Sequence, residues 1–257
     1  MTAVVGYSNQ IDAASLSGGS WNASYPLTNL KNRYLAQRAR STNATTGATV
    51  IDIDLGSAQS IGLVALVAHN LSAAATVRIQ GSSSASQTPS LYDSTAETIY
   101  TGGTDYAKTF TAVSARYWRI SINDTGNTAG YVEIGRIFIG LRFKPATTNI
   151  DWGESLGIQS RSNVQESISG HEFFEQRPSR RVWTAKWSWL TDSEALISLH
   201  TIMDAMDVYY EVYLIADDTD TSYRAQRNFL GRFRQLSPIE YPYLSVHACG
   251  VEISELL

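Results

Sequence analysis

Four histidines and one cysteine are the side chains of this sequence best suited to metal binding or nucleophilic catalysis. His69, His171, His200 and His247 are scattered, and no two of them have the spacing of paired metal ligands. Cys249 shares a strand face with His247, which does not by itself make a nucleophile and its base, so we expect a buried thiol. The sequence therefore predicts no catalytic residues, no metal site and no cofactor.

Aromatic, amide and guanidinium groups gather in a loop-like stretch near the start of the chain. Sugar recognition uses an aromatic face for stacking and directional polar groups for the hydroxyls. The candidate carbohydrate-binding residues are Trp21, Asn22, Tyr25, Arg38 and Arg40. The competing interpretation, in which these are ordinary loop and packing residues, stays open.

A second unusual segment, residues 169–181, places two adjacent phenylalanines among arginines and glutamates. Neighbouring residues of a strand point to opposite faces, so we expect one phenylalanine in the core and the other exposed. Exposed aromatic residues beside arginine are typical of protein interfaces. The candidate oligomer-interface residues are His171, Phe173, Phe174, Arg177, Arg180 and Arg181. The alternative is an ordinary hairpin with its charges in water.

Composition limits the function classes. Hydrophobic residues make up 43% of the 257 residues, which is enough for a folded core. The net charge of −4 argues against binding of nucleic acid through its phosphates. A single cysteine cannot form an internal disulfide, and no apolar run is long enough for a membrane-spanning helix, so we expect no membrane insertion.

The charge is divided unequally along the chain. Residues 1–145 carry 11 Lys and Arg against 8 Asp and Glu, whereas residues 146–257 carry 9 against 16. The change falls in the polar stretch Lys144–Asn149, which contains a proline. We therefore predict two domains, residues 1–145 and residues 146–257.

The first of these predicted domains has the pattern of short strands separated by turns. Val50–Leu55, Thr76–Gln80 and Arg116–Ile122 alternate between apolar and polar residues, and Ile61–Ala68 is nearly all apolar. Tyr131–Ile139 is a further strand with Gly135 as a candidate bulge. Without helical periodicity, this pattern favours a β-sandwich of the jelly-roll type.

The second predicted domain contains one clear helix. Thr191 and Glu194 have the spacing of a capping box, and the stripe of Leu196, Leu199, Ile202, Met203 and Met206 predicts a helix over residues 191–206. Before it, Val182–Trp189 alternates as a strand whose face of Trp183, Ala185, Trp187 and Trp189 is expected to pack against the helix as core. The alternative is that the three tryptophans stack on sugar rings. Further strands are expected at Tyr209–Ile215, Tyr223–Gln235 and Leu244–Ile253. The fold class is therefore mainly β: a jelly roll followed by a β-sandwich with one packed helix.

Residues 20–140 resemble a bacterial galactose-binding-like (discoidin-type) jelly roll. The resemblance rests on five stretches: Ser20–Pro26, Ile51–Gly56, Val77–Ser82, Ala115–Ile120 and Val132–Ile137. Many modules of this type carry a cysteine pair, which this chain lacks.

Residues 150–257 resemble the tube-like module of siphophage distal tail proteins, in the order of strands, capped helix and closing strands and in the segment Phe229–Phe233. The order of the two modules is reversed relative to the usual distal tail protein. The resemblance implies a structural virion component of a phage-type tail tip, assembled in the host bacterial cytoplasm. It implies a homo-oligomeric ring, most often a hexamer, that contacts the tube, hub and tape-measure proteins.

The sequence leaves two other functions open. One is a carbohydrate-binding adhesin, in which the jelly roll contacts host surface glycans. The other is an enzyme with a jelly-roll accessory, for which the sequence offers no catalytic set. The acidic second half suits a channel that DNA crosses, because negative walls repel phosphates.

Overall fold

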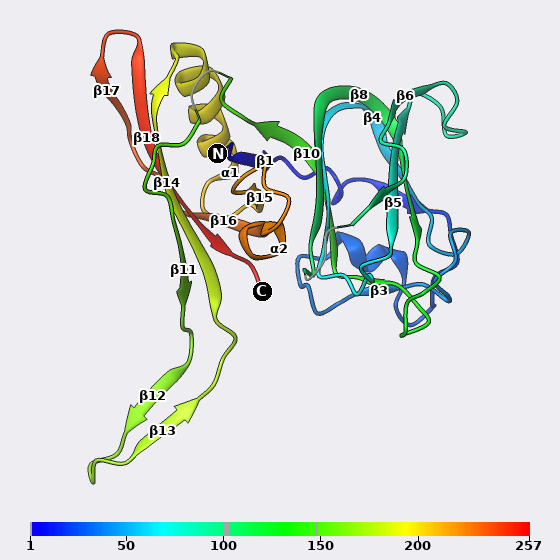
Figure 1. Ribbon diagram of the computed structural model, residues 1–257, viewed down its shortest axis with the longest axis horizontal. Coiled ribbons are helices and arrows are strands. Elements are labelled where there is room, and N and C mark those ends of the chain that lie inside the picture. Colours follow the sequence, from blue (N-terminus) through cyan, green and yellow to red (C-terminus); the bar gives the residue numbers. More distant parts are fainter. Residues whose placement is uncertain (1, 100–102, 147–148) are drawn as a thin grey trace.

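The computed structural model describes residues 2–99, 103–146 and 149–257. Antiparallel strands dominate it, and a short helix packs on one of their faces, so the predicted mainly-β class is confirmed (Figure 1). Thr147 and Thr148, which belong to the predicted boundary stretch, lie outside the described residues.

The first half of the chain contains strands and one turn of 3-10 helix. Its elements are β1 (Val4–Tyr7), β2 (Ser15–Ser17), the 3-10 turn Leu27–Lys31, β3 (Ala39–Arg40), β4 (Ile51–Val67), β5 (Thr76–Ser82), β6 (Ser90–Asp93), β7 (Glu97–Thr98), β8 (Tyr106–Asn123), β9 (Glu133–Ile134) and β10 (Arg136–Phe143). The long strands β4 and β8 pair along most of their length and form the centre of this half.

Two glycines shape these strands differently from the prediction. The expected strands Val50–Leu55 and Ile61–Ala68 belong to one strand, β4, which bends at Gly56. The φ of Gly56 is +77°, and the ladder to β8 shifts register there before pairing resumes at Gln59. The expected strand Tyr131–Ile139 is divided at Gly135. A Cβ at Gly135 would lie 2.9 Å from the carbonyl oxygen of Leu35, so only glycine allows the backbones to approach so closely.

The second half contains a sheet, its helix and a long extension. Its elements are β11 (Ser155–Gln159), β12 (Asn163–Glu166), β13 (Glu172–Glu175), β14 (Arg180–Leu190), the π-helical turns Ser193–Leu199, α1 (His200–Met206), β15 (Val212–Ile215), α2 (Arg224–Arg227), β16 (Phe229–Gln235), β17 (Ile239–Tyr243) and β18 (Val246–Glu255). Strand β18 is central, because β14 pairs with one of its sides and β16 and β17 pair with the other.

The tryptophan strand is only partly as predicted. Trp183 and Trp187 are buried in the core beneath the helix, whereas Trp189 is 54% exposed. The ladder between β14 and β18 shifts between the pairs Trp187–Cys249 and Leu190–His247, so β14 contains one extra residue there. Such a bulge reverses the alternation of faces, and the expected burial of Trp189 is therefore wrong.

The helix begins at the predicted capping box. The Thr191 N–H donates to Glu194 Oε2 at 3.0 Å, and the Glu194 N–H donates to Thr191 Oγ1 at 3.3 Å. The Thr191 carbonyl also accepts the N–H of Ala195, as an N-cap carbonyl does.

The buried face of the helix departs from the prediction in its first turns. Leu199, Ile202, Met203 and Met206 are buried as expected, but Leu196 is exposed and Ala195 takes its place in the core. The wider π-helical turns of residues 193–199 change which residues face the sheet.

Two other predicted strands are shorter than expected. Of Tyr209–Ile215 only β15 is a strand, and Tyr209 and Tyr210 lie exposed before it. Of Tyr223–Gln235, the first part forms the helical turn α2 instead. The Asp220 side chain accepts hydrogen bonds from the N–H groups of Ser222 and Tyr223, which lie just before that turn.

The N-terminal strand β1 connects the two halves. It pairs with β10 on one side and with β15 on the other, so the strands of both halves form one continuous ladder. Ala3 and Val5 lie in the core beneath the helix, while Val4 contacts a third apolar cluster that includes Leu63 and Tyr213. Figure 1 shows β1 and β10 crossing between the two parts.

Candidate functional site

The extension formed by β12 and β13, which we call the arm, protrudes beyond the sheet (Figure 1). These two strands pair only with each other among the described residues. Phe173 and Phe174 are 65% and 69% exposed, so the expectation that one of them enters the core is wrong. The physical reason is position: the hairpin extends away from the sheet, and every residue of both strands is exposed.

The other candidate interface residues are not all on the arm. His171 and Arg177 are exposed at its two ends, and Arg177 forms an ion pair with Glu175. Arg180 lies on β14 and donates to the Gln159 side chain. Arg181 has a role in the fold instead.

Arg181 joins β14 to the end of the chain and to the loop before β16. Its guanidinium forms an ion pair with Glu255 at 2.5 Å. It also donates to the carbonyls of Ala225, Gln226 and Asn228. These bonds engage the Arg181 guanidinium with groups of its own chain.

The five candidate carbohydrate-binding residues come together around β3. The Arg40 guanidinium lies over the ring of Tyr25 at 4.4 Å and over that of Tyr131 at 4.2 Å, and its Nε donates to Glu133 at 2.7 Å. Arg38 approaches the same carboxylate at 3.5 Å. The Arg40 guanidinium is therefore in cation–π contact with two aromatic rings of the protein itself.

Trp21 and Asn22 border this cluster. The Trp21 indole N–H donates to the Val50 carbonyl at 3.3 Å, and the Asn22 side chain accepts from the Ser24 N–H. Tyr131 and Glu133 were missed as members of the cluster. Their signal was present, because residues two apart in the predicted strand lie on one face.

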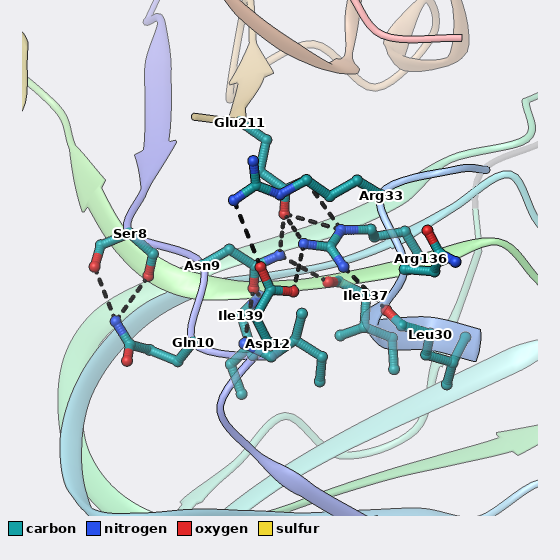
Figure 2. Close-up of polar contacts among 12 residues, drawn as sticks. Ser8, Asn9, Gln10, Asp12, Leu30, Arg33, Arg136, Ile137, Ile139 and Glu211 are labelled. Carbon is teal, nitrogen blue, oxygen red and sulfur yellow. Dashed lines mark hydrogen bonds and ion pairs between the residues drawn. The ribbon is translucent and has the colours of Figure 1, made fainter. Parts of the chain in front are cut away.

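A buried ionic network joins the two halves of the chain (Figure 2). Arg136, at the start of β10, is fully buried, and Glu211, just before β15, is 4% exposed. Arg136 Nε donates to both Glu211 oxygens at 2.9 and 3.0 Å, and its NH2 group donates to Asp12 at 2.7 Å.

Further hydrogen bonds complete the network. The Asn9 amide donates to Glu211 and to the Ile137 carbonyl, and the Arg136 NH1 group donates to the Leu30 carbonyl at 3.4 Å. A buried ion pair stays favourable only when its remaining donors and acceptors are satisfied, and this network satisfies them.

A groove lies beside this network, at the junction of the two halves. We define the junction groove by Lys31, Arg33, Tyr34, Tyr209 and Leu256, which line a hollow of 660 Å³. The Arg33 guanidinium lies 5.0 Å from the ring centre of Tyr209 and 3.7 Å from Asp12. Tyr34 and Tyr209 are exposed. Glu211 also lines the groove, but it is only 4% exposed and its carboxylate is paired with Arg136. The groove therefore combines aromatic surface with two cations and one buried, neutralised carboxylate.

Burial shifts the pKa of two further groups, His69 and Cys249. Burial lowers the pKa of His69 to about 4 and raises the pKa of the Cys249 thiol to about 11, so the imidazole is neutral and the thiol protonated at neutral pH. In residues 2–99, 103–146 and 149–257, no group of three or more His, Cys, Asp or Glu is placed to hold a metal ion. Within the same ranges, no helix has both the length and the apolar character to cross a bilayer.

No protein-family model matches the chain, and no curated protein matches it. Part of the chain is similar to solved carbohydrate-binding modules. The first module of family 32 from a family 31 glycoside hydrolase of Clostridium perfringens is 13% identical, with a TM-score of 0.43 over 52% of this chain and 99% of that one. The lectin domain of lectinolysin, complexed with Lewis B antigen, is 17% identical, with a TM-score of 0.42 over 51% of this chain and 95% of that one.

Longer proteins are matched over a smaller part of their length. SpGH29 has a TM-score of 0.41 and 14% identity, and the match spans 52% of this chain but 28% of that protein. With TM-scores below 0.5, these likenesses carry no argument about function.

Proposed function

We propose that the protein is a non-catalytic structural subunit that assembles into a homo-oligomeric ring through its arm. The observation that supports this most is the exposure of Phe173 and Phe174 on opposite faces of an isolated hairpin. A two-stranded hairpin with apolar side chains in water is at best marginally stable, so burial against another molecule stabilises it.

Head-to-tail contact between an arm and the body of the next copy is heterologous, and such contacts close into rings when the rotation permits. The place of the ring, between tube and baseplate in a phage-type tail tip, is our proposal from the sequence resemblance, as is the number of six subunits. The net charge of the second half supports it, because a negatively charged wall repels the phosphates of DNA that passes through.

The test uses the full chain, because β1 contributes to the core of the second half. Light scattering over a range of concentrations is expected to give a discrete multiple of 28.2 kDa. Phe173→Ser with Phe174→Ser should shift the mass to that of a monomer. The matched control is Trp152→Ser, which removes an aromatic side chain exposed away from the arm.

A wild-type chain that stays monomeric at high concentration would contradict the proposal. The proposal would also be contradicted if the Phe173→Ser and Phe174→Ser double variant kept the wild-type mass, as the Trp152→Ser control is expected to do. Circular dichroism of each variant distinguishes loss of assembly from loss of folding.

A second candidate function is carbohydrate binding by the jelly roll. The observation that favours it is the cluster around Arg40, in which Tyr25 and Arg38 remain partly exposed beside Asn22. An aromatic ring beside guanidinium and amide groups provides stacking and directional donors for hydroxyl groups.

Glycan-array binding that is lost in Tyr25→Ala and in Arg38→Ala would support this function. Binding that survives both substitutions would exclude this cluster. Tyr243→Ala, at an exposed tyrosine outside this cluster, the junction groove and the arm, is the control.

A further inference from the structure

The two faces of the arm differ in chemistry. In the ladder between its strands, Val164 lies opposite Phe174, and Glu166 lies opposite Glu172. Since side chains two apart share a face, these four residues form one surface, which we call the acidic face of the arm. It has an apolar pair nearer the body and a pair of carboxylates nearer the tip.

The carboxylate pair is unfavourable in an isolated chain. Like charges directly opposite each other in an antiparallel ladder repel and destabilise it. In the part of the chain that the structure describes, neither Glu166 nor Glu172 has a cationic partner. The acidic face therefore lacks both apolar cover and counter-charge.

The junction groove offers both. Lys31 donates to the Ala14 carbonyl, and no carboxylate pairs with it among the described residues. The contact of Arg33 with Asp12 is long, at 3.7 Å, and that carboxylate is already bound to Arg136 at 2.7 Å. Beside these cations lie the exposed rings of Tyr34 and Tyr209, and tyrosine and arginine are enriched where interfaces bind most strongly.

We propose that the acidic face of the arm of one copy binds in the junction groove of the neighbouring copy. Glu166 and Glu172 pair with Lys31 and Arg33, while Phe174 and Val164 pack on the tyrosine rings. The occupant comes from a second copy, because every residue of β12 and β13 is exposed in its own chain. This inference rests on the proposed assembly function and names the junction groove as the surface that receives the arm.

Charge reversal on either side tests the contact. Glu166→Lys with Glu172→Lys, and separately Lys31→Glu with Arg33→Glu, should each weaken self-association at least about tenfold in light scattering, because like charges then meet across the interface. Asn163→Lys with Gln165→Lys adds positive charge to the opposite face of the arm and is the control. It should leave the association constant within about threefold of wild type.

Mixing the two reversed variants gives a sharper result. In an alternating ring, every arm of one variant meets a groove of opposite charge on the other, so the mixture should regain the wild-type mass although neither variant assembles alone. Rescue also shows that both variants are folded. If the wild type assembles and both charge-reversed variants keep its mass, the junction groove is not the acceptor. The same conclusion follows if the mixture of the two variants does not regain the wild-type mass. Either result would leave the proposal of a ring standing. A monomeric wild type would instead overturn the assembly function itself.

Discussion

Arg136 and Glu211 lie 75 residues apart in the chain, yet their side chains form a bidentate ion pair in the interior. One residue starts β10 and the other precedes β15, and β1 lies between these two strands in the sheet. The pair therefore fixes the two halves to each other at the place where β1 joins them.

Removal of one partner should be costly. Arg136→Ala leaves the Glu211 carboxylate buried without its counter-charge, and we expect a loss of about 3–5 kcal/mol of unfolding free energy. Replacing both residues, with Arg136→Met and Glu211→Leu, should recover a large part of that loss. Urea unfolding measures both, with Arg78→Ala, at an exposed ion pair, as the control. Equal losses in the single and double variants would contradict the interpretation.

The bulge in β14 predicts opposite behaviour for two tryptophans. Trp183→Ala opens a cavity in the core and should cost about 3–5 kcal/mol of unfolding free energy. Trp189→Ala removes a largely exposed ring and should change it by less than about 1 kcal/mol. Denaturant midpoints measure both variants. A large loss for Trp189→Ala in the monomeric protein would place the bulge elsewhere.

The capping box should contribute measurably to stability. Thr191→Ala removes the hydroxyl that accepts the Glu194 N–H, and we expect a loss of about 1 kcal/mol. Ser193→Ala, in the first turn but outside the box, is the matched control. If the two variants unfold at the same denaturant concentration, Thr191 is not the N-cap.

Asp105 and His69 should give stability opposite dependences on pH. Burial raises the pKa of Asp105 to about 6, so the folded state holds a proton that the unfolded state has lost, and stability falls as pH rises from about 4 to 6. Burial lowers the pKa of His69 to about 4, so the unfolded state binds the extra proton, and stability rises over about pH 4 to 6.5.

Single substitutions separate these two effects. In Asp105→Asn only the effect of His69 remains, so the unfolding free energy should rise from pH 4 to 6.5. In His69→Gln only the effect of Asp105 remains, so the unfolding free energy should fall from pH 4 to 6. Denaturant unfolding at a series of pH values measures both slopes. Slopes of the same sign in the two variants would contradict the assignment.

The features predicted correctly from the sequence depend on local spacing. The alternation of Trp183 to Trp187 and the interval from Thr191 to Glu194 determine a strand and a helix start within a few residues. The alternation of apolar and polar residues within one segment predicts which of its faces is buried, so that prediction does not require the rest of the fold.

The features that were missed depend on partners distant in the chain. The extra residue before Leu190 is visible only in the ladder to β18, and nothing near Arg136 in the sequence indicates Glu211. Both phenylalanines are exposed because the arm extends beyond the edge of the sheet, where neither of its faces is covered. That geometry belongs to the tertiary structure rather than to the segment.

The position of β1 also affects the order of events during synthesis. When the ribosome has released residue 143, β1 can pair with β10, but the strand for its other edge, β15, is still about 70 residues from being made. Until then a short apolar edge stays open on the nascent chain, where it can pair with other chains. Strand β15 covers that edge only once it has been made.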